Sequence, residues 1–89
     1  MKYNTTTLKK IEDLMDDADY IVRYEKGNFK SGYCILKDKR VIVISKFYDT
    51  ESRINCFIDL LPLLDIAEET LEEKSLPVLR QLREQKVQA

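Results

Sequence analysis

Two glycines five residues apart, Gly27 and Gly32, give this sequence its nearest approach to a phosphate-binding loop. In such a loop the second glycine is followed by Lys and Ser or Thr and opens a helix, so that backbone N–H groups cradle the phosphates. Here Tyr33 and Cys34 follow Gly32 and lead into strand-like residues. We therefore predict no nucleotide site at this position. Gly32 instead indicates a bulge or a close backbone approach.

The side chains that could act as nucleophiles lack an activating partner. The chain contains no histidine, which is the commonest general base in enzymes. Ser31 and Ser45 each adjoin a lysine, but successive residues of a strand point to opposite faces. Cys34 and Cys56 form no Cys-x-x-Cys motif, so we expect neither a zinc site nor a disulfide framework. We interpret both as small buried apolar residues; a reactive thiol is the alternative. No enzyme activity, metal or cofactor is expected.

Carboxylates gather at two places in the sequence. The first group follows a predicted helix and lacks the longer run of oxygen ligands, closed by Glu, that a calcium loop requires. The second group occupies a segment near the C-terminal end. The members of the two groups are Asp16, Asp17 and Asp19, and then Asp65, Glu68, Glu69, Glu72 and Glu73. We interpret both groups as solvent-exposed surface.

Length and composition predict one small α+β domain. With 89 residues, of which 44% are apolar and 35% charged, the chain can build a single core. We assign the domain to residues 1–89, with its core at about 7–64 and a helical segment at 66–89. No stretch reaches the roughly 20 apolar residues of a membrane span, and the polar start does not resemble a signal peptide. The expected location is a reducing cytoplasm.

Charge is distributed unevenly, although the net charge is only -1. Residues 23–46 carry seven Lys or Arg and two acidic residues, a net of +5. Residues 49–77 carry eight acidic residues and two basic ones, a net of -6. The two regions can attract each other and keep the molecule soluble. Alternatively, the basic strands present a surface to an acidic partner.

Helices are predicted on both sides of a strand-rich centre. Apolar residues at helical spacing predict a first helix from about Thr7 to Asp17, with an N-cap among the threonines that open it. Asp49 and Thr50 are N-cap candidates for a second helix, from Glu51 to about Leu64. This helix is apolar nearly all round, so we expect it to be buried on more than one side. Pro62 should kink or end it.

The segment after the second helix is harder to assign. Residues 66–76 are acidic and are compatible with either a helix or a loop. Ser75 could cap a last helix, with Pro77 tolerated in its first turn.

Three strands are predicted in the centre, at Tyr20–Glu25, Ser31–Lys37 and Arg40–Lys46. The turns between them, at residues 26–28 and 38–39, are too short for parallel crossovers. We therefore predict an antiparallel β-meander, flanked by one helix before it and one kinked or two separate helices after it. Its third strand is apolar on both faces and so expects cover on both, yet in a meander it lies at an edge.

Several stretches resemble a family of small uncharacterised bacterial proteins found in Bacteroidetes-type genomes. They are Ile21–Cys34, Val41–Ile44 and Arg53–Asn55, and the resemblance covers roughly residues 8–61. It implies no particular activity.

The order of helix, hairpin, apolar strand and apolar helix is also similar to the core of the ImmA/IrrE-type metallopeptidases. In that family the last helix carries His-Glu-x-x-His, whose two histidines bind zinc beside the general base. The matching region here, about Phe57 to Leu61, reads Phe-Ile-Asp-Leu-Leu. This resemblance therefore implies a degenerate scaffold without zinc ligands.

Nucleic-acid binding is the alternative function. The predicted order of elements resembles the double-stranded-RNA-binding domain, but that family uses a loop histidine and a basic start to its second helix. This chain has no histidine and begins that helix with Asp49-Thr50-Glu51. A different surface, on the basic hairpins, could combine aromatic stacking with cations for phosphate. Its residues would be Tyr24, Lys26, Phe29, Lys30 and Tyr33.

Surplus apolar surface is the main functional signal. The third strand and the second helix present apolar side chains on more sides than a small sheet can cover. We therefore predict a non-catalytic cytoplasmic protein-interaction module that forms homo-oligomers, for example a homodimer, or binds another protein. The expected interface comprises the outward pair among Val41, Ile42, Val43 and Ile44, together with Phe57, Leu60 and Leu64.

Overall fold

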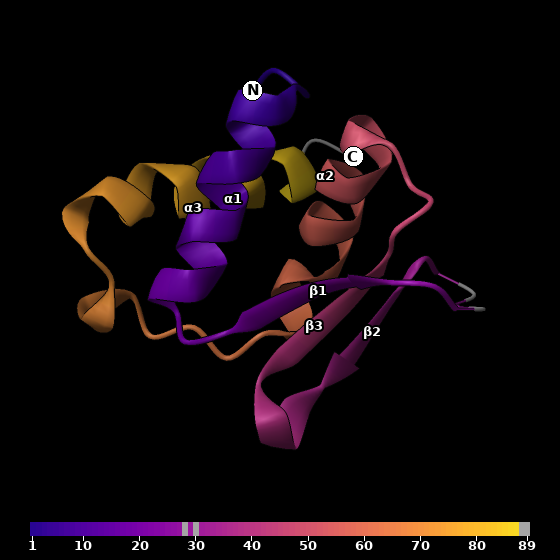
Figure 1. The fold of residues 1–89 in the computed structure, drawn as a ribbon. Helices are drawn as coiled ribbons and strands as arrows, with labels where there is room; N and C mark the ends of the chain where they lie inside the picture. Colours follow the sequence, from indigo (N-terminus) through magenta and orange to yellow (C-terminus); the bar gives the residue numbers. More distant parts are fainter. Residues whose placement is uncertain (28, 30, 88–89) are drawn as a thin grey trace.

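The computed structural model describes residues 1–27, 29 and 31–87, with only the backbone at 86 and 87. In this part of the chain, one helix precedes and two helices follow a group of strands, and 3-10 turns lie between β2 and β3 and between α2 and α3 (Figure 1). The helices are α1 (Thr5–Asp17), α2 (Thr50–Leu60) and α3 (Leu76–Val87), and the strands are β1 (Ile21–Glu25), β2 (Tyr33–Leu36) and β3 (Val41–Ser45). The predicted α+β class is confirmed. No helix in the described part has the length and hydrophobicity needed to cross a membrane.

The order of strands differs from the prediction. β3 lies between β1 and β2, parallel to β1 and antiparallel to β2. The predicted meander, purely antiparallel and with the third strand at an edge, is therefore wrong. A strand that is apolar at four successive positions is best covered when it has a neighbour on each side. Because β3 lies between β1 and β2, the connection from β1 to β2 passes the end of β3 and does not join adjacent strands.

β3 is buried along its whole length. Ile42 and Ile44 have no exposed surface and belong to the core, whereas Val41 and Val43, on the opposite face, are 6% and 8% exposed. All three helices lie on one side of the sheet (Figure 1). The side chains of Ile42 and Ile44 therefore pack beneath the helices, and those of Val41 and Val43 are screened chiefly by neighbouring strands.

A side-chain cap opens each of the first two helices, but the N-cap predicted among the threonines of the first helix is wrong, because the cap is Asn4 and the threonines lie inside α1. The Asn4 side chain accepts a hydrogen bond from the Thr7 N–H at 2.9 Å, so α1 begins slightly earlier than predicted. The Asp49 side chain accepts from the Ser52 N–H at 2.8 Å, which confirms the predicted cap of α2. α2 ends at Leu60 and continues as a 3-10 turn, because Pro62 cannot continue the helical hydrogen bonds.

The C-terminal segment completes the core. Residues 66–76 contain two 3-10 turns, η3 (Glu68–Thr70) and η4 (Glu73–Ser75). α3 follows, and its Leu79 and Leu82 are fully buried with residues of α1 and α2. The core therefore extends beyond residue 64, where the sequence analysis placed its end.

Arg40 ties three segments together where β1 and β3 begin. Its backbone is left-handed, with φ 53°, and its guanidinium lies 4.1 Å from the centre of the Tyr20 ring. The guanidinium donates hydrogen bonds to the carbonyls of Ala18 at 2.6 Å, Asp19 at 3.1 Å and Asp65 at 3.1 Å. These contacts hold the end of α1, the start of β3 and the chain after α2 in one place.

Gly32 stands where a side chain cannot be accommodated. Its φ is +82°, and a Cβ built there would lie 2.3 Å from the Tyr48 ring. A close approach does occur at this glycine, but the group that approaches is the Tyr48 side chain and not another backbone segment. Gly27 is different, because a Cβ there would meet only the tip of the Phe29 ring, at 2.7 Å.

We expect Gly32→Ala to lower the free energy of unfolding by about 2–4 kcal/mol, since it combines backbone strain with overpacking against Tyr48. Gly27→Ala is the matched control and should cost less than about 1 kcal/mol, because a ring tip can move aside. Urea unfolding followed by circular dichroism measures both. Equal losses from the two substitutions would contradict the assigned role of Gly32.

Asp17 anchors the C-terminal segment to α1. Its carboxylate accepts a hydrogen bond from the Glu72 N–H at 2.8 Å. A hydrogen bond from the Ser75 side chain, and then the bond from Glu72, lower the pKa of Asp17 below its ordinary value of 3.8. The stabilisation is therefore present above that value and is lost as the pH falls through the lowered pKa of the folded state.

Asp17→Asn should consequently flatten the loss of stability on acidification below the ordinary pKa of 3.8. Unfolding curves recorded from neutral to strongly acidic pH would show this. Asp38→Asn, at an exposed position of the β2–β3 turn, is the control. It should leave the loss of stability at acid pH as in the wild type. If Asp17→Asn lost stability on acidification as steeply as the wild type, the anchoring role of the Asp17 carboxylate would be ruled out.

Candidate functional site

Among the described residues, one face of the sheet is not covered by any helix (Figure 1). We call it the outer face; in register, its rows are Ile21–Val41–Leu36, Arg23–Val43–Cys34 and Glu25–Ser45. The other side chains of the strands, such as Ile42 and Ile44, face the helices and pack in the core or against it. Ile21 and Leu36, at opposite edges of the outer face, are 58% and 43% exposed. The outer face thus has buried valines at its centre and exposed apolar side chains at its margins.

Two opposite charges stand side by side on the β1 margin of the outer face. Arg23 Nε lies 3.8 Å from Glu25 Oε2, and the two side chains are 61% and 52% exposed. An ion pair of this length and exposure contributes little to stability. Both side chains therefore remain available to a group arriving at β1.

β1 also has an edge without a partner in the part of the chain that the structure describes. The Ile21 N–H donates to the Arg40 carbonyl at 2.9 Å, and the Glu25 carbonyl accepts from the Lys46 N–H at 3.1 Å. Since the peptide groups of a strand alternate in direction, those of Ile21, Arg23 and Glu25 are directed toward β3. The N–H and C=O groups of Val22 and Tyr24 are directed toward the free edge.

A hollow of about 370 Å³ borders this edge. We call it the α1–β1 hollow; its lining residues are Lys9, Glu12, Asp13, Asp16, Tyr20, Ile21, Val22 and Tyr24. Tyr24 is held in it from both sides, because its hydroxyl donates to Glu12 and the Arg53 guanidinium stacks on its ring at 4.1 Å. Burial, and then the bond to Glu12, raise the pKa of Tyr24. The tyrosine is thereby fixed as a neutral donor, and the α1 side of the hollow is acidic.

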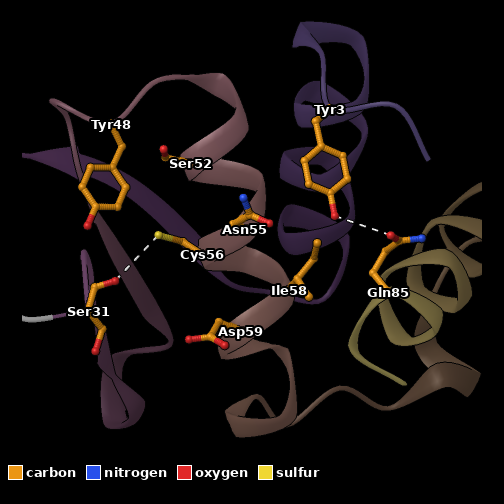
Figure 2. A pocket seen from close by; sticks show the side chains of 9 residues that line it. All are labelled: Tyr3, Ser31, Tyr48, Ser52, Asn55, Cys56, Ile58, Asp59 and Gln85. Atoms are coloured by element: carbon orange, nitrogen blue, oxygen red, sulfur yellow. Dashed lines mark hydrogen bonds between the residues drawn. The ribbon is translucent and has the colours of Figure 1, made fainter. Parts of the chain in front are cut away.

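A second hollow, of about 490 Å³, contains the buried thiol (Figure 2). Cys56 Sγ lies 4.0 Å from the Ser31 carbonyl on one side of α2, and Tyr3 and Gln85 lie on the other. Burial, and then the negative charge of Asp59, raise the pKa of Cys56. A raised pKa leaves little thiolate at neutral pH, so this arrangement does not activate a nucleophile.

The residues predicted for the interface mostly lie inside the molecule. Val41, Ile42, Val43 and Ile44 form the central strand, Phe57 and Leu60 have no exposed surface, and Leu64 is partly buried against the core. The surplus predicted on β3 followed from placing that strand at an edge, and the surplus predicted on the second helix did not allow for the cover that α1 and α3 give it. The interface predicted for these residues stays a prediction. The apolar side chains that motivated it are mostly buried inside the fold.

The structure describes four of the five residues of the nucleic-acid alternative. Tyr24 and Tyr33 both face the helices, on either side of Ile44, and are packed against the core. Lys26 is exposed and Phe29 partly buried. Lys30, and Asn28 of the predicted turn, lie outside the described residues.

Within the described residues, no three His, Cys, Asp or Glu side chains form a group that could hold a metal ion. The region matched to the metallopeptidase motif, Phe57–Leu61, is the buried end of α2 and the start of its 3-10 turn. In comparisons with known proteins, no family model, curated protein or solved structure matches the chain.

The candidate features that sequence reasoning missed are the outward direction of the Val22 and Tyr24 peptide groups and the helix-free face beside them. Arg23 and Glu25 could be assigned to one face of a strand from alternation alone. Their significance depends on which peptide groups of β1 face its neighbour, and that follows only from the register of β1 with β3.

The two thiols should differ in reactivity. Cys34 is partly exposed on the outer face, whereas Cys56 is 5% exposed and has a raised pKa. In the single-cysteine variants Cys56→Ser and Cys34→Ser, we expect iodoacetamide to modify Cys34 at least about tenfold faster than Cys56. The two rates should converge in denaturant. Equal rates in the native protein would contradict the placement of these thiols.

Proposed function

We propose that this protein is a non-catalytic, cytoplasmic interaction module that associates with a second copy of itself through the free edge of β1. The observation that carries the proposal is the outward direction of the N–H and C=O groups of Val22 and Tyr24. An unpaired strand edge is a template for another strand, and extension of a sheet is a common mode of protein recognition.

Sheet extension is favoured over stacking of two outer faces. Three strands about 4.8 Å apart, two of five residues and one of four, span only about 14 Å by 17 Å. That area is far below the roughly 800 Å² per partner of a standard interface. Extension at β1 adds main-chain hydrogen bonds, which stacking does not supply.

The second copy is favoured as the partner by the charges beside the edge. Arg23 and Glu25 have opposite signs and lie on the same face of β1. In a two-fold symmetric pair of β1 strands, Arg23 of each copy can therefore lie opposite Glu25 of the other, which gives the contact twice. An unrelated strand would have to match this alternation independently.

The non-catalytic assignment is supported by the state of the reactive groups. The pKa of Cys56 is raised rather than lowered. Both cysteines are free, which fits a reducing compartment.

Sedimentation equilibrium over a wide concentration range should show a monomer–dimer equilibrium. Amide hydrogen exchange locates the contact: the N–H groups of Val22 and Tyr24 should become protected as concentration rises. Those of Tyr33 and Ile35 are the matched control, since they are directed to the free edge of β2. Their protection should not change. A monomer at every concentration, or protection that appears at β2 instead, would overturn the proposal.

A further inference from the structure

We infer that the two copies pair their β1 strands antiparallel about a two-fold axis at Tyr24, which joins the two sheets into one continuous sheet. The inference rests on the proposed function and adds the register of the pairing. It also identifies the groups that each copy contributes to the other. Hydrogen-bond direction, charge and the α1–β1 hollow each bear on that register.

The direction of the peptide groups limits how the strands can meet. In an antiparallel pair, residues that exchange both hydrogen bonds alternate with residues that exchange none. Within β1, Val22 and Tyr24 direct these groups to the free edge. With the axis at Tyr24, Tyr24 opposes its own copy and Val22 opposes Lys26 of the second copy. Arg23 and Glu25 then occupy the positions without hydrogen bonds, where opposing side chains are closest.

Charge separates this register from its neighbours. An axis at Arg23 places two arginines opposite each other, and an axis at Glu25 does the same with two glutamates. Like charges directly opposite each other are destabilising, whereas opposite charges attract. Only the axis at Tyr24 places Arg23 of each copy against Glu25 of the other. The weak 3.8 Å pair within one strand is thereby supplemented by two cross-strand pairs.

The α1–β1 hollow supplies a further complementary contact. Lys26 is exposed immediately after β1, and continued alternation places it on the face of Val22 and Tyr24. Opposite Val22 of the second copy, its ammonium group lies beside that copy's hollow. The α1 side of the hollow carries Glu12, Asp13 and Asp16 against one lysine, Lys9, which pairs with Asp13 at 3.0 Å, so that side keeps an acidic excess. The symmetry of the pair provides this contact twice.

Charge reversal tests the register. Arg23→Glu creates two Glu–Glu oppositions, and Glu25→Arg creates two Arg–Arg oppositions, so each variant alone should dimerise at least about tenfold more weakly than the wild type. An equimolar mixture of the two variants restores opposite charges at every position. The mixture should therefore form a heterodimer with near-wild-type affinity, measured by sedimentation velocity and by fluorescence transfer between labelled copies.

Two controls accompany this test. Lys37→Glu makes the same charge change at an exposed site of the β2–β3 turn and should leave dimerisation unchanged. The second control is a thermal melt of each variant, which should show that Arg23→Glu and Glu25→Arg remain folded, since both side chains are exposed.

The outcomes distinguish the register from the proposed function. A wild-type dimer whose affinity neither reversal alters would overturn the inferred register while self-association stands. Variants that weaken but do not recover on mixing would likewise reject the Arg23–Glu25 opposition. A wild-type protein that remains monomeric would overturn both the function and the register.

Discussion

The central position of β3 is the constraint on which the rest of the structure depends. Its four successive apolar residues need cover on both faces, and its peptide groups need partners on both sides. Placing β1 on one side and β2 on the other meets both needs, with Ile42 and Ile44 beneath the helices and Val41 and Val43 between flanking strands. Because β3 occupies the centre, β1 and β2 necessarily form the edges.

The parallel pairing of β1 with β3 requires both strands to begin at the same end of the sheet. Asp19, just before β1, and Arg40, just before β3, both have left-handed backbones, with φ 64° and 53°. The Arg40 guanidinium stacks on Tyr20 and donates to the Asp65 carbonyl, and the Asp65 N–H donates to the Tyr20 hydroxyl at 2.8 Å. The turns before β1 and β3 and the chain after α2 thus all contact the Arg40 guanidinium. The fixed donor geometry of arginine suits this arrangement.

Local signals in the sequence were sufficient for the elements but not for their arrangement. Asp49 marked the start of α2 and Pro62 its end, because capping and proline act within a few residues. The short turn at residues 37–39 correctly indicated that β2 and β3 are antiparallel neighbours. The connection after β1 was also short, yet it spans the end of the sheet, and no local pattern distinguishes that path from a hairpin. The informative signal was the two-faced apolar character of β3, which is incompatible with an edge.

The candidate interface illustrates why net charge says little about association. The whole chain has a net charge of -1, and the run from residue 23 to 46 is strongly basic, so neither value predicts attraction between two identical copies. Association about a two-fold axis depends on which charge opposes which, and that is set by register. Arg23 and Glu25 are also the kind of charged side chains that protect edge strands from unwanted pairing. In the dimer that we propose, the same two residues disfavour most incoming strands and favour a single arrangement with the protein's own copy. Specificity of this kind arises from repulsion in the wrong registers as much as from attraction in the right one.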